Sequence, residues 1–153
     1  MREIARQVGV DAAMISRYFG CKEDLFAEAL ISGGEEGRSW MDGPREDFGV
    51  RLAHQLIYEP QNDEKLCGVM MMLRANGSSK ACEVVRRVIA DEYMTPFEAW
   101  LGGENAQARA LLASSIMMGA TLCLSLTGPP EDPEEKRLMC ERLAQALQAC
   151  VDG

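Results

Sequence analysis

A short segment near the start of the chain combines small side chains with one arginine at helical spacing. In a helix over about residues 12–19, one side carries Ala12, Ala13, Ser16 and Arg17, and apolar residues face the other way. The guanidinium fork of Arg17 can pair with O6 and N7 of guanine, and an alanine can touch a thymine methyl or let the backbone come close. The segment therefore presents a small, sparsely polar face that suits contact with base edges in a DNA groove.

Two short helices with a tight turn between them must position this face. Apolar residues recur at helical spacing over residues 4–8, and Gly9 follows as the residue that most easily adopts a positive φ at a helix end. Asp11 is a favoured N-cap for the second helix, because its carboxylate can accept hydrogen bonds from free backbone N–H groups. This pattern predicts a helix-turn-helix.

The segment resembles the TetR-type one-component repressors over about thirty residues. The residues that match at the family's spacing are Ile4-Ala5, Val8-Gly9-Val10, Tyr18-Phe19, Lys22 and Leu25-Phe26. The resemblance implies an all-α protein with a helix-turn-helix DNA-binding head, followed by a helical-bundle domain for ligand binding and dimerisation. The DNA partner would be a palindromic double-stranded operator, which requires a two-fold protein.

The resemblance also implies which residues contact DNA. Base edges would be contacted by Ala12, Ala13, Ser16 and Arg17, and phosphates by Tyr18 and Lys22. Ser16 stands where the family often has an aromatic residue, so the sequence preference should differ from that of close relatives. Lys22 also lies at an expected helix N-terminus, where backbone N–H groups favour an anion. The alternative is an ordinary solvated helix face with two cations.

A further expectation concerns the start of the chain. The family's DNA-binding domain has three helices before a long connecting helix, and residues 1–19 match the second and third. Glu3 lies where a capping box places its N3 carboxylate, but the matching N-cap would precede Met1. We expect that roughly 20 to 30 residues are absent, an estimate from the mean helix length and its flanks. The absent helix would brace the other two.

Length and charge limit the other possibilities. A chain of 153 residues with 47% apolar residues can form one compact domain with a small appendage. The net charge is −8, of which the first 30 residues carry −1, so a broadly basic DNA-binding surface is excluded and DNA contact must depend on a few placed cations. No signal peptide and no uninterrupted apolar run long enough for a membrane span are visible, so we expect a cytoplasmic protein.

The cysteines favour neither a metal site nor catalysis. The six cysteines are scattered without a C-x-x-C pair, and the chain has one histidine, His54. We expect free thiols, with a redox sensor or metal site as the less favoured alternative. Cys67 or Cys82 could pair with His54 as nucleophile and base, but no phosphate loop or carboxylate pair accompanies them, so we expect neither enzyme activity nor a cofactor.

The remaining helices divide the chain into two parts. A helix is expected over about 22–32, with Cys21 as a weak N-cap, and Gly33-Gly34 should interrupt it. We place a domain boundary after this helix, between a DNA-binding part (1–40) and a ligand-binding and dimerisation part (44–153). Within the second part, helices are expected over about 45–58, 63–75, 78–101 and 105–127. The helix over 78–101 should kink at Pro96, because a residue before proline, here Thr95, disfavours helical geometry. A last helix should begin at Pro133, with Asp132 as its N-cap. The helix over 105–127 is apolar nearly all round, which predicts burial on most sides.

The resemblance implies two functions for the second part. A small-molecule effector, apolar or amphipathic by default, would bind between the middle helices, with candidate residues Leu56, Met70, Leu73, Arg74, Val85, Ile89, Tyr93, Trp100 and Met117. His54 and Asn76 are further polar candidates. A homodimer would form through the last two helices. The alternatives are ordinary core methionines, a monomer core, and a dimeric small-molecule- or partner-binding protein with a defunct DNA-binding head.

Overall fold

A computed structural model describes residues 1–35, 40–59, 63–75 and 77–153 of the chain, and within these ranges the regular structure is helical. The elements are α1 (Arg2–Val8), α2 (Ala12–Phe19), α3 (Lys22–Glu35), the 3₁₀ turn η2 (Arg45–Asp47), α4 (Phe48–Tyr58), α5 (Asp63–Ala75), α6 (Ser79–Ile89), the π-helical turn η3 (Ala90–Met94), α7 (Thr95–Leu101), α8 (Ala106–Thr127) and α9 (Pro133–Asp152). The predicted all-α fold is confirmed.

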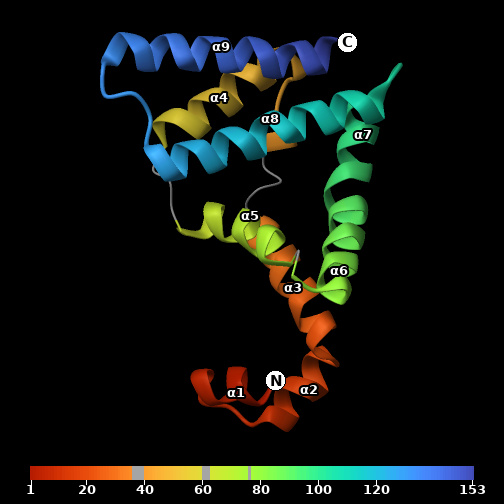
Figure 1. Ribbon diagram of the computed structural model, residues 1–153. Coiled ribbons are helices and arrows are strands. Elements are labelled where there is room, and N and C mark those ends of the chain that lie inside the picture. Colours follow the sequence, from red (N-terminus) through yellow and green to blue (C-terminus); the bar gives the residue numbers. More distant parts are fainter. Residues whose placement is uncertain (36–39, 60–62, 76) are drawn as a thin grey trace.

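The helices form a small head and a larger body that α3 connects (Figure 1). The head consists of α1, α2 and the first turns of α3, and it holds the amino terminus at one end of the molecule. In the body, α9 lies along α4, α8 crosses beneath them, and α6 and α7 run up one side. The carboxyl terminus lies at the end far from the head.

The caps predicted from the sequence set the helix ends. Gly9 has φ 72° after α1, and the Asp11 carboxylate accepts a hydrogen bond from the Ala13 N–H at 2.8 Å at the start of α2. Asp132 accepts from the N–H groups of Glu134 and Glu135 at 3.0 and 2.9 Å, with Pro133 as the first residue of α9. Each cap satisfies backbone groups that the helix itself cannot pair.

Two expected helix breaks do not occur. α3 continues through Gly33 and Gly34 to Glu35, because a helical glycine costs only about 1 kcal/mol and tertiary packing can outweigh it. Thr95 is helical (φ −60°, ψ −48°), and α6, η3 and α7 follow one another directly. The π-helical turn precedes Pro96 and leaves it in the first turn of α7, where the missing N–H is tolerated.

The main core of the body lies where α4, α7, α8 and α9 meet. Its fully buried side chains include Phe48, Phe97, Leu101 and Leu147. The Trp40 ring packs edge-on against Phe97 with centroids 4.6 Å apart, so Trp40, which precedes α4 in the chain, is part of the same core. Aromatic rings in this arrangement add to the free energy gained by burial alone.

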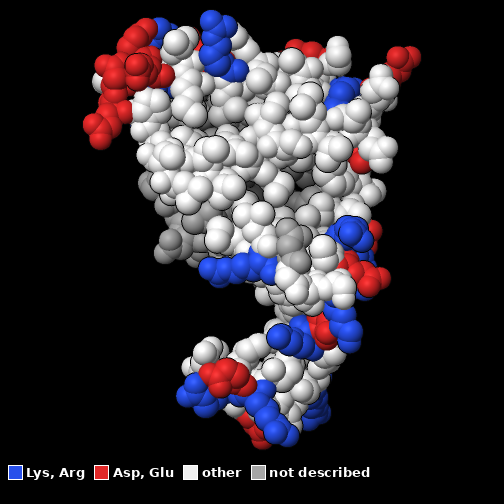
Figure 2. Space-filling model, viewed as in Figure 1, with Lys and Arg blue, Asp and Glu red and all other residues white. Residues whose placement is uncertain are grey.

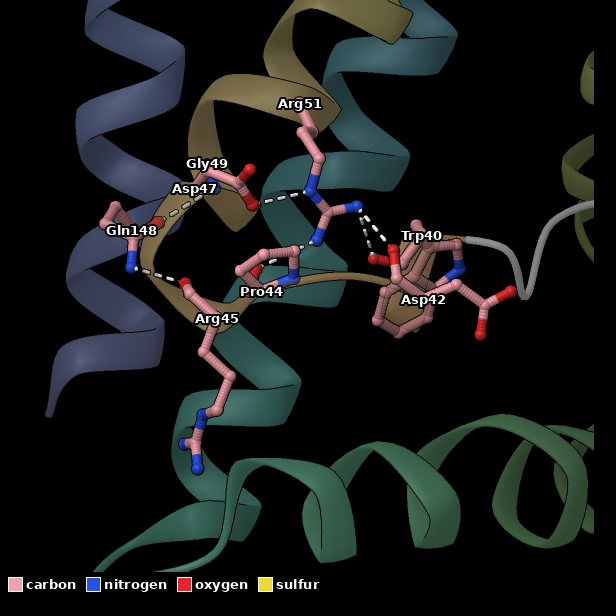
Figure 3. A network of polar contacts seen from close by, with 8 residues as sticks. All are labelled: Trp40, Asp42, Pro44, Arg45, Asp47, Gly49, Arg51 and Gln148. Carbon is pink, nitrogen blue, oxygen red and sulfur yellow. Dashed lines mark hydrogen bonds and ion pairs between the residues drawn. The ribbon is translucent and has the colours of Figure 1, made fainter.

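A network of polar contacts fixes the segment before α4 (Figure 3). The Arg51 guanidinium donates to the Asp47 carboxylate at 2.7 Å and to the carbonyls of Asp42 and Pro44 at 2.9 and 3.1 Å. Gln148 of α9 accepts from the Gly49 N–H and donates to the Arg45 carbonyl, both at 2.9 Å. These bonds satisfy backbone groups that lie outside regular helix and tie the start of α4 to α9.

The sequence prediction that α8 is buried on most sides is wrong for the single chain. Along the helix, the large apolar residues left exposed are Leu111, Leu112, Met118 and Leu126, the last at 74%. By length and composition alone, α8 could also cross a membrane, but it packs in the helical bundle against α4, α7 and α9. An apolar face remains that no other part of the described chain covers.

Replacing Gly49 with alanine should separate α4 from α9 and destabilise the body. A Cβ at this position would lie 2.2 Å from the Ala144 carbonyl oxygen and 2.8 Å from the Gln148 nitrogen, both backbone atoms. We expect Gly49→Ala to lower the free energy of unfolding by about 1–3 kcal/mol, measured by urea denaturation, although alanine ordinarily favours helix.

Gly77→Ala is the matched control, because its Cβ would meet nothing closer than 3.8 Å. If both variants were as stable as the parent chain, the α4–α9 contact would not be as close as described.

Candidate nucleic-acid interface

The outer face of α2 is largely exposed in the part of the chain that the structure describes. The head buries Ala5 of α1 and Ile15 of α2, and the buried Ala27 of α3 lies further along the chain. Ala13, Ser16 and Arg17 are exposed on the opposite side of α2, with Ala12 half-buried beside them. α2 is therefore held by one apolar side and presents the predicted base-contacting side to solvent.

The two residues predicted to contact phosphate flank this face. Tyr18, in the last turn of α2, is 77% exposed, and Lys22 is exposed as the first residue of α3. In the part of the chain that the structure describes, neither Arg17 nor Lys22 forms an ion pair, whereas Arg6 donates to the Glu3 carboxylate at 3.1 Å. That contact lowers the pKa of Glu3 and occupies Arg6. Arg17 and Lys22 are thus the cations of this surface that remain available to a ligand.

The start of α3 differs from the expectation of a poor cap. Asp24, at the N3 position, forms the reciprocal half of a capping box: its carboxylate accepts from the Cys21 N–H at 3.0 Å and from the Cys21 thiol at 2.9 Å. These bonds lower the pKa of Asp24 and raise the pKa of the Cys21 thiol. Because Asp24 brings a negative charge to this helix start, attraction of a phosphate there depends on the ammonium group of Lys22 rather than on the helix end.

Charge is distributed unevenly over the molecule. In Figure 2, lysine and arginine side chains lie among acidic ones on the head and on the narrow part above it, whereas an acidic cluster lies at the far corner of the body. The first turn of α9 carries Glu134 and Glu135, close to Glu131 and Asp132 in the chain. Part of the net charge of −8 is therefore kept far from the head, where it would repel DNA least.

The predicted effector residues lie in several environments. Leu56, Trp100 and Met117 pack against the main core, and Ile89 and Tyr93 pack against a second core cluster that contains Val85. On α5, Met70 is half-buried, Arg74 is exposed and Leu73 is 45% exposed rather than directed inward as predicted. Of the further polar candidates, His54 is exposed with its ring 4.8 Å from that of Tyr58, and Asn76 lies outside the described residues.

Two cavities lined by described residues include some of these candidates. The first, the neck cleft, has a volume of about 600 Å³ between head and body, with apolar walls that include Ile4, Phe26 and Met71 and a rim with Lys22, Arg74 and Lys80. The second, the side groove, has a volume of about 660 Å³ and is lined by residues of α6, η3, α7 and α8, among them Val85, Arg86, Ile89, Met94, Glu98 and Leu111. Both volumes suit a small organic ligand.

Comparison with protein families covers both parts of the chain. Residues 1–29 match the family model described as bacterial regulatory proteins, tetR family, and residues 46–151 match the model described as tetracyclin repressor-like, C-terminal domain. The chain belongs to the TetR family. It is thus a TetR-type transcriptional regulator, and regulators of this family are generally not enzymes. A search among curated proteins finds no match.

The structure adds one residue of the head, Asp24, that sequence reasoning missed. Asp24 could have been found as the acidic N3 residue that follows the Cys21 N-cap.

The cysteines that the structure describes are free thiols: Cys21, Cys82, Cys123, Cys140 and Cys150. Within the described residues, no three metal-ligating side chains come together. The side chain of Cys67 lies outside that description.

Replacing Asp11 with alanine should destabilise α2 without touching its outer face. The substitution removes the acceptor for the Ala13 N–H, which costs about 1 kcal/mol for a typical N-cap. We expect faster amide hydrogen exchange in α2. Asp11→Asn keeps an acceptor oxygen and should behave like the parent chain; equal exchange in all three proteins would show that this cap does not hold the helix.

Proposed function

We propose that this TetR-family chain is a repressor that binds a palindromic operator as a homodimer and is released by a small apolar or amphipathic ligand. The observation that carries the proposal is the exposed outer face of α2, where Arg17 stands without an ion-pair partner among the described residues. The roles combine what the family resemblance implies with the chemistry of each side chain. Arg17 reads guanine, Ala12, Ala13 and Ser16 allow close approach to the bases, and Tyr18 and Lys22 contact phosphates.

The dimer would form through α8 and α9. Leu112, Gly119 and Leu126 recur at intervals of seven residues, and a Cβ on Gly119 would meet nothing within 4 Å. A small residue at the centre of an exposed apolar face allows a second helix to pack closely. On α9, Leu138 is exposed, whereas Ala144, Leu147 and Val151 are buried, so we assign the centre of the interface to α8.

Release by an effector requires a site whose occupancy changes the position of the head. The proposed effector residues are Leu56, Met70, Leu73, Arg74, Val85, Ile89, Tyr93, Trp100 and Met117. Of these, Arg74 lines the neck cleft, and Val85 and Ile89 line the side groove. A ligand shifts the population of DNA-competent dimers only if it binds the two head positions with different affinities. The protein would act in the cytoplasm, where DNA and ligand meet.

The test is a fluorescence-anisotropy titration of the 153-residue chain with the DNA that flanks its own gene, at two salt concentrations and beside scrambled DNA. Tight, sequence-selective binding with a modest salt dependence is expected, because few cations contact the phosphates. A folded dimer that binds neither DNA would contradict the proposal and favour a ligand- or partner-binding protein with a defunct head.

Replacing Arg17 with alanine should relax sequence preference. We expect a loss of about 1–3 kcal/mol of discrimination at one base pair in each half-site, measured by competition between operator variants. Lys22→Ala is the comparison, because loss of a phosphate contact should weaken binding equally on all sequences and reduce the salt dependence. If Arg17→Ala also weakened binding uniformly, Arg17 would be a phosphate contact.

Replacing Leu112 with glutamate should prevent dimerisation. Leu112 is 56% exposed in the single chain, and a charge there would be buried twice in a two-fold interface. We expect sedimentation to show monomers at concentrations where the parent chain is dimeric, together with loss of operator binding. Val50→Glu is the control, since Val50 is 62% exposed on α4. If Leu112→Glu remained dimeric, the interface would lie elsewhere.

A further inference from the structure

The π-helical turn η3 is an unusual element at an important place. π-helical turns are rare, and they often occur at functional sites. Residues Ala90–Met94 form this turn between α6 and α7, at the level where the body meets α3. The turn contacts a cavity on one side and the connecting helix on the other.

On its cavity side, η3 forms part of the wall of the side groove. Ile89, Ala90, Met94 and Thr95 all line this groove, together with Leu111 of α8. The groove is mainly apolar, and Arg86 and Glu98 add charged groups to its lining. A ligand in the side groove would therefore press directly on the π-helical turn.

On its other side, η3 contacts the helix that carries the head. The Tyr93 hydroxyl donates a long hydrogen bond, 3.4 Å, to the carbonyl oxygen of Leu30 in α3. Leu30 itself is buried, and the Tyr93 ring packs against the same cluster, which contains three valines of α6. Tyr93 is thus the residue of η3 that holds both the side chain and the backbone of α3.

A group of charged side chains lies nearer to the head. Arg87 of α6 lines a small cleft with Asp24 and Glu28 of α3, and Asp91 and Glu92 line the same cleft. The positive charge of Arg87 adds to the effect of the Cys21 hydrogen bonds in lowering the pKa of Asp24. This attraction acts between side chains at the surface and is screened by solvent, so it fixes the angle of α3 less firmly than the packing around Leu30.

We propose that Tyr93 is the positioning residue that sets the angle of α3, and hence of the head, and that the side groove acts on the head through it. A π-helical turn contains one residue more than a regular helical turn, and each residue of an α-helix rotates by about 100°. A ligand that made η3 regular would therefore swing Tyr93 away from Leu30. The inference rests on the proposed repressor function, whose regulation it specifies.

The test is Tyr93→Phe, which removes one hydroxyl and keeps the ring in its cluster. We expect operator affinity to fall about three- to tenfold with an unchanged salt dependence, because fewer heads would stand at the competent angle while the same cations contact DNA. Tyr58→Phe is the matched control: Tyr58 is exposed on α4, and its ring contacts Lys136 and His54.

A distance measurement separates this inference from the proposed function. Spin labels would be attached through encoded azide side chains that replace Gln7 of α1 and Gln145 of α9. The distance between the two labels reports the position of the head relative to the body. Labelled chains are diluted with unlabelled ones, so that the distance is measured within one chain. Tyr93→Phe should broaden this distance distribution, whether or not the chain binds DNA, and Tyr58→Phe should leave it unchanged. An unchanged distribution in Tyr93→Phe, with or without a lower melting temperature, would overturn the inference, as would equal broadening in both variants.

Discussion

The burial of α3 against α6 is the interaction on which the position of the head depends. Ala27 and Leu30 of α3 pack against Val84, Val85 and Val88 of α6, and no other described cluster joins the head-bearing helix to the body. The head itself buries few side chains, so its own packing cannot fix its direction. Ala75 of α5 belongs to the same cluster, so apolar contacts of α3 with α6 and α5, each contributing of the order of 1 kcal/mol, decide where α2 points. In the proposed mechanism, a ligand would shift the head by changing this small set of contacts.

The body supplies the rigid frame for this contact. Two features hold the far end of the bundle together. α4 and α9 approach each other closely at Gly49. The Arg109 guanidinium donates to four backbone carbonyls, two in the α7–α8 loop and two at the end of α9. α6 and α7 extend from that frame through η3 to reach α3. In the proposed mechanism, a change at the side groove would reach the head through this continuous stretch of helix.

The sequence predicted what depends on neighbours in the chain and missed what depends on tertiary packing. The turn at Gly9 and the caps at Asp11 and Asp132 were predicted because each is fixed by residues within three positions. The continuation of α3 through two glycines and the helical Thr95 after a π-helical turn were not, because the local preferences of glycine and of a residue before proline are weak and do not decide the conformation alone. Of the six predicted DNA contacts, Ala12 is half-buried and the others are exposed. The effector candidates lie in separate clusters, because apolar periodicity predicts burial and does not distinguish a core from a pocket.

The dependence of DNA affinity on half-site spacing would show whether two heads bind DNA as one two-fold unit. Operators would be selected from random DNA with the chain itself, and base pairs would then be inserted between the two half-sites. A two-fold repressor should have one preferred spacing and lose at least about tenfold in affinity when five base pairs are added, because half a helical turn moves the second major groove to the opposite side. Equal affinity at every spacing, or equal affinity for a single half-site, would show that the heads bind independently and would contradict a two-fold repressor.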